Sequence, residues 1–246
     1  MPLKTRDFIL EALDDLGISD YAARPFDCAF ELLAAPPSRK RLIMMGFNGS
    51  LADNGHTNAG AVREGYENPQ SSNLTLGVEG GWRRSTRLAN QLTMLPAALG
   101  FDSRDTIYTN ALLLCSADAA SISRVARQSP AGSLEALARK SMDFFERVTV
   151  PLAEPELIIA YGNGLKAPSA ARILWERFGV GEVLDHVETS FYRATFGFTA
   201  TINGRRVPVV GVRHLSRYVP QVEAIKRARE RQSMFSRSGS AIPVKP

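Results

Sequence analysis

The feature that most constrains the fold is a regular alternation of short apolar runs with helical patterns. Three apolar runs have the length of buried strands, at 41–45, 106–109 and 157–161. A helical pattern follows each of them, at 82–99, 133–148 and about 165–178. Ser133 precedes the second helix as a candidate N-cap. Strands that alternate with helices in this order predict a parallel sheet with helices on both faces.

A hairpin follows the third helix and completes the predicted sheet. Residues 191–202 alternate between apolar and polar side chains, as in an antiparallel strand. Asn203-Gly204 is a strong hairpin turn signal, and 206–212 is the expected return strand. We therefore expect an α/β fold, a three-layer α/β/α sandwich around a central, mostly parallel four-stranded sheet.

The remaining segments complete one predicted domain over 1–235. Helices are expected at 7–16 and 26–34, in an N-terminal helical segment that covers 1–40. Residues 46–81 are rich in Gly, Asn and Ser without a clear period, which predicts a long loop. A basic helix at 221–233 and a disordered basic tail at 236–246 end the chain.

Composition argues against a metal, a cofactor and a membrane. Cys28 and Cys115 are far apart and form no C-x-x-C pair, and the three histidines lack metal-ligand spacing. No apolar run approaches the roughly 18 residues that span a bilayer. The first fifteen residues contain Asp and Glu and no cleavage site, unlike a signal peptide. We expect a cytoplasmic protein, a monomer, that needs no cofactor.

Positive charge gathers toward the C-terminus. The whole chain carries +5, whereas 204–246 holds ten basic and two acidic residues and so carries +8. A basic end on a nearly neutral body is typical of a protein with a polyanionic partner. The alternative is a solvated basic helix with a frayed tail.

Polar residues follow each predicted strand, where the sites of parallel α/β folds lie. They are found in the segments 46–50, 110–111, 162–164 and 213–217. No phosphate-binding P-loop, dinucleotide-binding glycine motif or G-x-S-x-G elbow is present. NTPases, Rossmann enzymes and α/β-hydrolases are therefore not indicated.

These four segments together resemble the motifs of the uracil-DNA glycosylase superfamily, over roughly 41–231. LIMMGFNGS at 42–50 is similar to the G-[IM]-N-P-[GS] motif, and IYTNALLLC at 107–115 to the strand that ends in T-N. Residues 157–165 resemble the third strand and its glycine turn, and VGVRHLSR at 210–217 resembles the strand that leads to H-P-S. Each motif alone is weak, but four in the right order are moderately specific.

The resemblance implies a monofunctional DNA glycosylase that flips a nucleotide out of DNA and excises its base, with DNA, double- or single-stranded, as partner. The implied catalytic residues are Asn48 and His214, with Asp53 as a further carboxylate candidate. The implied substrate-binding residues are Gly46, Phe47, Gly49, Ser50, Tyr66 and Asn110. The implied DNA-binding residues are Gly162, Asn163, Gly164, Arg213, Ser216, Arg217, Tyr218, Lys226 and Arg227.

The chemistry fits these residue types. An amide is not a useful base near neutral pH, but the Asn48 carbonyl oxygen can position the water that attacks C1′. Asn110 can pair with a pyrimidine edge, and His214 can donate a hydrogen bond to the departing base. Tyr218 is a candidate wedge that enters the DNA stack.

Two family prolines are replaced, by Gly49 and Leu215. The resemblance implies uracil or another modified pyrimidine as the substrate. The glycine and the long loop favour a pocket open to a bulkier base, which extends this expectation to the hypermodified cytosines of phage DNA. A role in base-excision repair and a role in antiviral defence are both compatible with this chemistry. The alternatives are an inactive nucleic-acid-binding module on the same fold and a hydrolase of free nucleosides.

Overall fold

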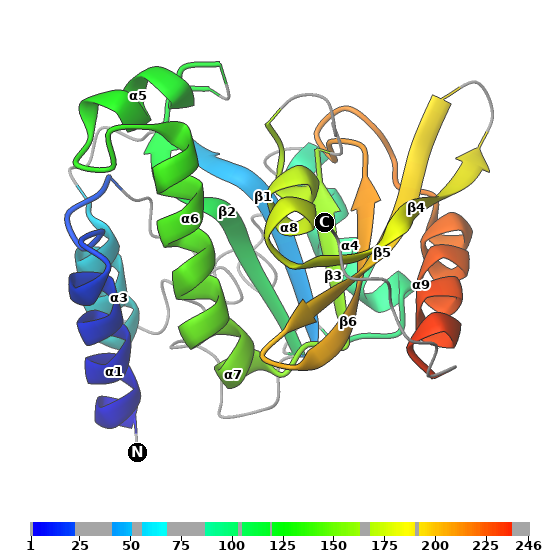
Figure 1. Cartoon of the computed structure of the whole chain (residues 1–246), viewed down its shortest axis with the longest axis horizontal. Helices are drawn as coiled ribbons and strands as arrows, with labels where there is room; N and C mark the ends of the chain where they lie inside the picture. Colours follow the sequence, from blue (N-terminus) through cyan, green and yellow to red (C-terminus); the bar gives the residue numbers. More distant parts are fainter. Residues whose placement is uncertain are drawn as a thin grey trace.

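The structure, a computed structural model, describes residues 2–22, 41–50, 56–67, 87–102, 105–118, 120–162, 168–189 and 192–237. Helices and strands alternate through these ranges and form an α/β fold with helices on both faces of one sheet (Figure 1). The predicted helix at 26–34 and the predicted tail at 236–246 lie outside the described residues, except 236 and 237.

One mixed sheet of six strands forms the centre of the fold, in the order β2-β1-β3-β6-β5-β4. Its strands are β1 (Leu42–Ser50), β2 (Thr106–Ser116), β3 (Leu157–Tyr161), β4 (Gly179–Thr189), β5 (Tyr192–Ile202) and β6 (Arg205–Val212). The first four in spatial order run parallel, whereas β5 pairs antiparallel with both β6 and β4. The predicted four-stranded sheet is therefore corrected to a six-stranded mixed sheet.

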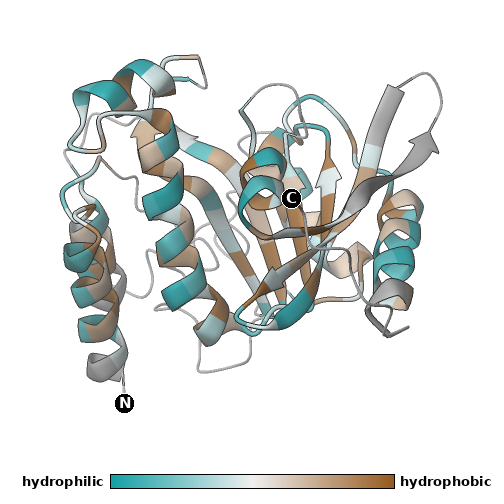
Figure 2. Ribbon diagram, viewed as in Figure 1, coloured by the Kyte–Doolittle hydropathy of each residue, from teal (hydrophilic) through white to brown (hydrophobic). Residues whose placement is uncertain are grey.

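Helices enclose the sheet through two hydrophobic cores, one on each face (Figure 2). Side chains of successive strand residues point to opposite faces. On β1, Ile43 and Met45 enter the larger core, while Leu42 and Met44 enter the smaller one. Because both faces of β1 are buried, its first four residues form a continuous apolar run, as the sequence suggests.

The larger core packs under the helices α1 (Pro2–Asp15), α5 (Ile122–Gln128), α6 (Leu134–Phe144) and α8 (Ala170–Phe178). A π-helical turn (Phe145–Thr149) and the short α7 (Val150–Ala153) continue α6. The smaller core packs under α4 (Arg87–Ala98) and α9 (Val222–Arg237). Ser133 caps α6 as predicted, because its hydroxyl accepts from the Ala136 backbone N–H at 3.1 Å.

The predicted long loop at 46–81 is wrong in part. β1 continues through it to Ser50, and α3 (Asn58–Glu67) forms within it. Asn58 is fully buried, and its amide nitrogen donates to the carbonyl oxygens of Ile18 and Leu113 at 2.9 Å each. Hydrogen bonds of this kind join residues that are far apart in the chain and have no local sequence signature. The Gly- and Asn-rich composition therefore predicted a loop where a helix forms.

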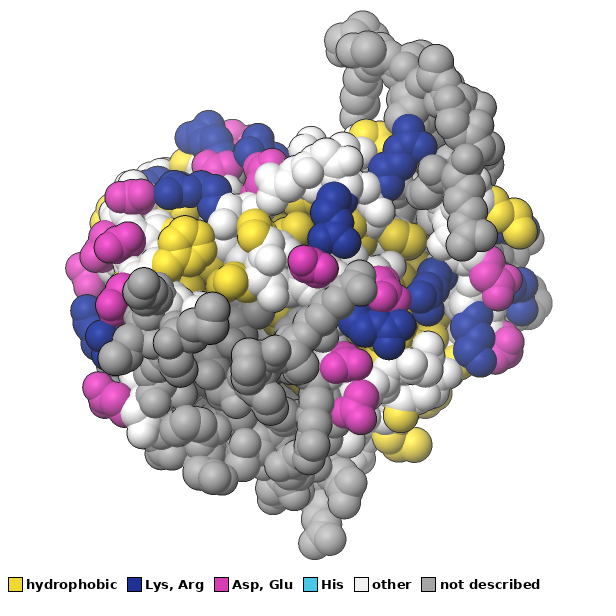
Figure 3. Space-filling model, turned by 90° about the horizontal axis from the view of Figure 1, so that it is seen from below, with side chains coloured by type: hydrophobic (Ala, Val, Ile, Leu, Met, Phe, Trp, Pro, Cys, Tyr) yellow, Lys and Arg dark blue, Asp and Glu magenta, His cyan; other side chains and the backbone are white. Residues whose placement is uncertain are grey.

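Ion pairs gather at the edge where the parallel strands begin, here called the amino edge. Arg41 donates to both carboxylate oxygens of Glu156 at 3.0 and 2.9 Å, and Arg229 lies 3.8 Å from the same carboxylate. Arg205 lies 3.9 Å from Glu154. Figure 3 views the molecule from this side and shows acidic and basic side chains next to one another. Opposite charges therefore offset each other at the amino edge.

The β5–β6 hairpin forms as predicted around Asn203-Gly204, both with positive φ of 51° and 74°. Within it Phe196 lies directly opposite Gly211. A Cβ atom at Gly211 would lie 2.3 Å from the Phe196 ring, so the ring occupies the place of a side chain. This contact fixes the strand that leads to His214.

We expect Gly211→Ala to lower the free energy of unfolding by about 1–3 kcal/mol, because the new methyl group overpacks the Phe196 ring. Chemical denaturation followed by circular dichroism measures the loss. Phe196→Leu in the same background provides the control, since a smaller side chain relieves the clash. The double variant should then cost less than the two single changes together; strict additivity would show that the ring contact is unimportant.

Candidate active site

Four parallel strands bring polar residues together at the edge where they end, here called the carboxyl edge. Gly46 on β1 pairs in register with Asn110 on β2, and Tyr161 on β3 pairs with Val212 on β6. Tyr161 also lies beside Gly46, because the pairing of β1 with β3 reaches the preceding residues, Met45 and Ala160. One row across the sheet therefore contains Asn110, Gly46, Tyr161 and Val212.

Two polar groups occupy the place that a side chain at Gly46 would take. A Cβ atom there would lie 2.6 Å from the Asn110 amide oxygen and 2.6 Å from the Tyr161 hydroxyl. These groups come from the strands on either side of β1, so they face each other above Gly46. Asn110 is buried and Tyr161 is partly buried. An amide and a phenol therefore meet directly above Gly46.

His214 joins this group through Tyr161. The two rings pack edge to face with centroids 5.8 Å apart. A Cβ atom at Gly162 would lie 3.6 Å from the His214 ring, an ordinary van der Waals distance, so the ring lies beside the end of β3. Gly162 has φ of +90°, and its N–H donates to the Val212 carbonyl at 2.9 Å, which ties β3 to the start of the His214 loop.

The surroundings of His214 favour a neutral ring. Partial burial, and then the positive charge of Arg217, lower the pKa of His214 below its ordinary value. Its Nδ1 lies 2.7 Å from the Ser216 hydroxyl and accepts from the Ser216 backbone N–H at 3.3 Å. Since Nδ1 accepts, the ring hydrogen is on Nε2. His214 therefore offers an N–H donor without carrying a charge.

Asn48 is held two residues beyond Gly46 on β1. Its amide nitrogen donates to the Gly49 carbonyl and to the Ser116 hydroxyl, both at 2.9 Å. An amide nitrogen carries two hydrogens, so both are engaged and the orientation of the amide is set. The carbonyl oxygen of Asn48 is then the atom that accepts from a water or ligand.

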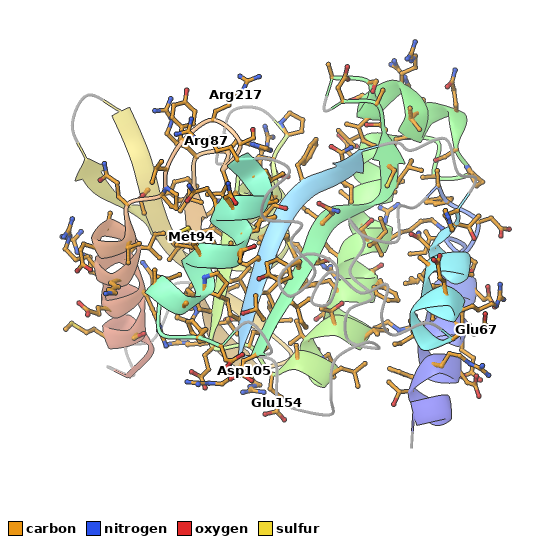
Figure 4. All side chains as sticks on the ribbon, turned by 180° about the vertical axis from the view of Figure 1, so that it is seen from behind. Glu67, Arg87, Met94, Asp105, Glu154 and Arg217 are labelled. Atoms are coloured by element: carbon orange, nitrogen blue, oxygen red, sulfur yellow. The ribbon has the colours of Figure 1, made fainter. Side chains whose placement is uncertain are left out.

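The loop from β6 to α9 (213–221) is anchored by Leu215 and exposes aromatic and apolar groups. Leu215 is fully buried in the smaller core and so anchors the loop by packing. The Arg213 guanidinium lies 3.3 Å from the centre of the Tyr218 ring. Tyr218 and Val219 of the loop are 38% and 61% exposed. Figure 4 shows Arg217 of this loop and Arg87 of α4 at the same edge.

Other predicted residues lie away from this group. Phe47 packs against the larger core, on the opposite face from Asn110 and Tyr161. Lys226 pairs with Glu223 at 2.9 Å on α9, and Arg227 is exposed on the same helix. α9 runs from the carboxyl edge toward the amino edge, so its last turns lie at the opposite edge from the loop that follows β6 (Figure 1).

Several predicted positions are described only in part or not at all. Asp53, Asn163 and Gly164 lie outside the described residues. Ser50 is placed by its backbone, opposite Ser116, and Tyr66 by its backbone in α3.

Tyr161 is the residue of the group that sequence reasoning missed. It closes the apolar run Leu-Ile-Ile-Ala-Tyr, and strand alternation places it on the same face as Leu157 and Ile159. A tyrosine at the carboxyl end of a buried parallel strand, directly before a glycine, was the available signal.

The described part of the chain gives no sign of a metal or membrane site. Within it, no three His, Cys, Asp or Glu side chains gather into a group that could hold an ion. None of its helices has the length and apolar character needed to cross a bilayer. Comparison of the chain with protein-family models and with curated proteins gave no match.

We expect the His214 ring to titrate below the ordinary histidine value and Arg217→Gln to raise its pKa, since removal of a nearby positive charge favours protonation. NMR titration of the imidazole carbons measures both values. Arg147→Gln is the matched control, because Arg147 pairs with Asp15 on another part of the surface. An equal rise in the two variants would show that Arg217 has no direct effect.

Proposed function

We propose that this protein is a monofunctional DNA glycosylase that excises uracil or another modified pyrimidine from DNA. The observation that carries the proposal is the row of Asn110, Gly46 and Tyr161 with His214 against it. A flipped base needs hydrogen-bonding groups that read its edge and a donor that stabilises its negative charge as it departs. The row and the histidine supply groups of both kinds.

Asn110 and Tyr161 read the base in this proposal. A side-chain amide and a phenol together offer donors and acceptors, as the edge of a pyrimidine does. Their separation is kept by Gly46, because any side chain there would meet both groups. A base that lies against this pair of groups therefore contacts both strands that flank β1.

Asn48 directs the attacking water. Its carbonyl oxygen accepts a hydrogen from the water, whose oxygen forms a bond to C1′ of the deoxyribose. The bond from C1′ to the base breaks, its electron pair leaves with the base, and the water proton passes to solvent. An amide does not take this proton itself, so catalysis comes from positioning and electrostatics.

His214 stabilises the leaving base. A neutral ring with its hydrogen on Nε2 donates to a base oxygen as that oxygen becomes negative. Because the ring is neutral in the free protein, no acidic residue is needed to balance a positive charge on it. Tyr218 and Val219, exposed on the same loop, fill the gap that the flipped nucleotide leaves in the stack.

The direct test is incubation of the protein with phage and host DNAs and with oligonucleotides that carry uracil, hydroxymethylcytosine or glucosylated cytosine, followed by mass spectrometry of released bases. We expect release of one of these bases and an abasic site. His214→Ala should lower the single-turnover rate about 10²–10³-fold, as for the loss of one stabilising donor. Asn48→Ala should lower it as well.

Glu176→Gln on α8, which breaks only an exposed ion pair, is the control and should leave the rate unchanged. Binding of DNA without base release from any substrate would instead favour an inactive nucleic-acid-binding module. Release from free nucleosides but not from DNA would identify a nucleoside hydrolase.

A second test addresses the close approach of Asn110 and Tyr161 above Gly46. Gly46→Ala places a methyl group within 2.6 Å of both the Asn110 amide oxygen and the Tyr161 hydroxyl, so these groups must separate. We expect base release to fall at least tenfold. Tyr161→Phe, which removes a base-reading hydroxyl without adding a methyl group at Gly46, should lower the rate as well. Wild-type activity in Gly46→Ala would contradict a role for the close approach of Asn110 and Tyr161.

A further inference from the structure

We infer that helix α5 binds the phosphate backbone of DNA. This helix follows β2, whereas the His214 loop follows β6, so the two elements lie at opposite ends of the row of parallel β-strands. The inference rests on the proposed function and adds a second DNA-binding element to it. Arg124 and Arg127 carry the charge, and both are exposed on α5.

A chain of hydrogen bonds through Ser116 and Asp118 connects α5 to Asn48. The Asn48 amide donates to the Ser116 hydroxyl, which in turn donates to the Asp118 carbonyl at 2.6 Å. The Asp118 carboxylate then accepts from the Ser121 backbone N–H at 2.7 Å, at the start of α5. The helix therefore begins three hydrogen bonds away from the residue that positions the water.

The opposite end of the site carries its own cations. Arg217 is exposed on the His214 loop, and Arg87 is exposed at the start of α4, at the same edge (Figure 4). The two basic groups thus lie beyond β2 on one side and beyond β6 on the other. Three strand spacings separate β2 from β6, which is about 14 Å. At about 3.4 Å per nucleotide along a strand, this distance accommodates several phosphates.

The charges at the two edges of the sheet are arranged differently. At the amino edge Arg41, Arg205 and Arg229 are paired with Glu154 or Glu156. Among the described residues, by contrast, Arg87, Arg127 and Arg217 make no ion pair, and Arg124 interacts only at longer range with Asp118. Cations without acidic partners attract a polyanion, and this edge also holds Asn48, Asn110 and His214.

A phosphate backbone is the polyanion that this arrangement fits. The cations come from three elements that are far apart in the chain, and they lie on either side of groups suited to a base. Arginine binds phosphate oxygens through two parallel N–H donors. A strand held at both ends would present the nucleotide between them to Gly46 and Tyr161.

The test is the salt dependence of binding to undamaged DNA, measured by fluorescence anisotropy with a labelled duplex and a labelled single strand between 50 and 200 mM salt. We expect Arg124→Gln/Arg127→Gln to reduce the slope of log K against log salt by about 1.8 on the duplex and about 1.4 on the single strand. Arg127→Gln alone, which leaves Arg124 beside Asp118, should produce about half of this change.

Arg147→Gln/Arg177→Gln is the matched control, because it removes the same charge from two arginines paired with acidic residues elsewhere. Its slope should remain close to that of the wild type. Equal slopes for the two double variants would overturn the inference, because the effect would then reflect net charge alone.

The outcome is independent of base release. A reduced slope in a protein that releases no base would leave α5 as a backbone contact and reject the glycosylase. Base release with an unchanged slope would reject the contact and leave the glycosylase. An equal loss of binding to DNA and to a polyglutamate peptide would also overturn the assignment to nucleic acid.

Discussion

The site depends on the parallel pairing of β1 with both β2 and β3. This pairing places Gly46 between Asn110 and Tyr161, so that two polar side chains from neighbouring strands meet where β1 has none. The rest of the fold keeps these three strands in register. Apolar residues bury both faces of β1, and a shift by one residue would turn Leu42 and Met44 toward the wrong core. The hydrophobic cores therefore determine which polar groups meet at the carboxyl edge.

Gly49 and Leu215, which stand where the motifs that the sequence resembles have prolines, have structural roles in this fold. A proline at Gly49 would remove a backbone N–H from β1, which continues through this residue to Ser50. Leu215 fills the smaller core instead of stiffening the loop, and so fixes His214 by packing. Both positions therefore take part in the packing and pairing that order the strand end and the loop.

Sequence patterns predicted the elements whose evidence is local. The buried run at 157–161, the Asn203-Gly204 turn and the Ser133 cap are confirmed, since each depends on residues within a few positions. β4 was missed, and β1 and β2 extend beyond their predicted ends, because their later residues pair with distant strands. In the candidate site, the sequence singled out Asn110 and His214 but not Tyr161, which joins them. That link arises from strand register and ring packing, which no motif of the chain records.

The sequence also does not show which charged residues are paired in the fold. Counted along the sequence, the C-terminal segment is the basic part of the chain, and α9 is its basic helix. In the fold, Arg205 and Arg229 from that segment are paired with acidic residues at the amino edge, and Lys226 with Glu223. Arg87 and Arg127, from segments that the sequence does not mark as basic, lie without ion pairs among the described residues. Arg227 and Arg231 of α9 also make no ion pair among the described residues and are exposed. Cations without acidic partners therefore lie both on α9 and at the carboxyl edge, a distribution that the charge count along the sequence does not show.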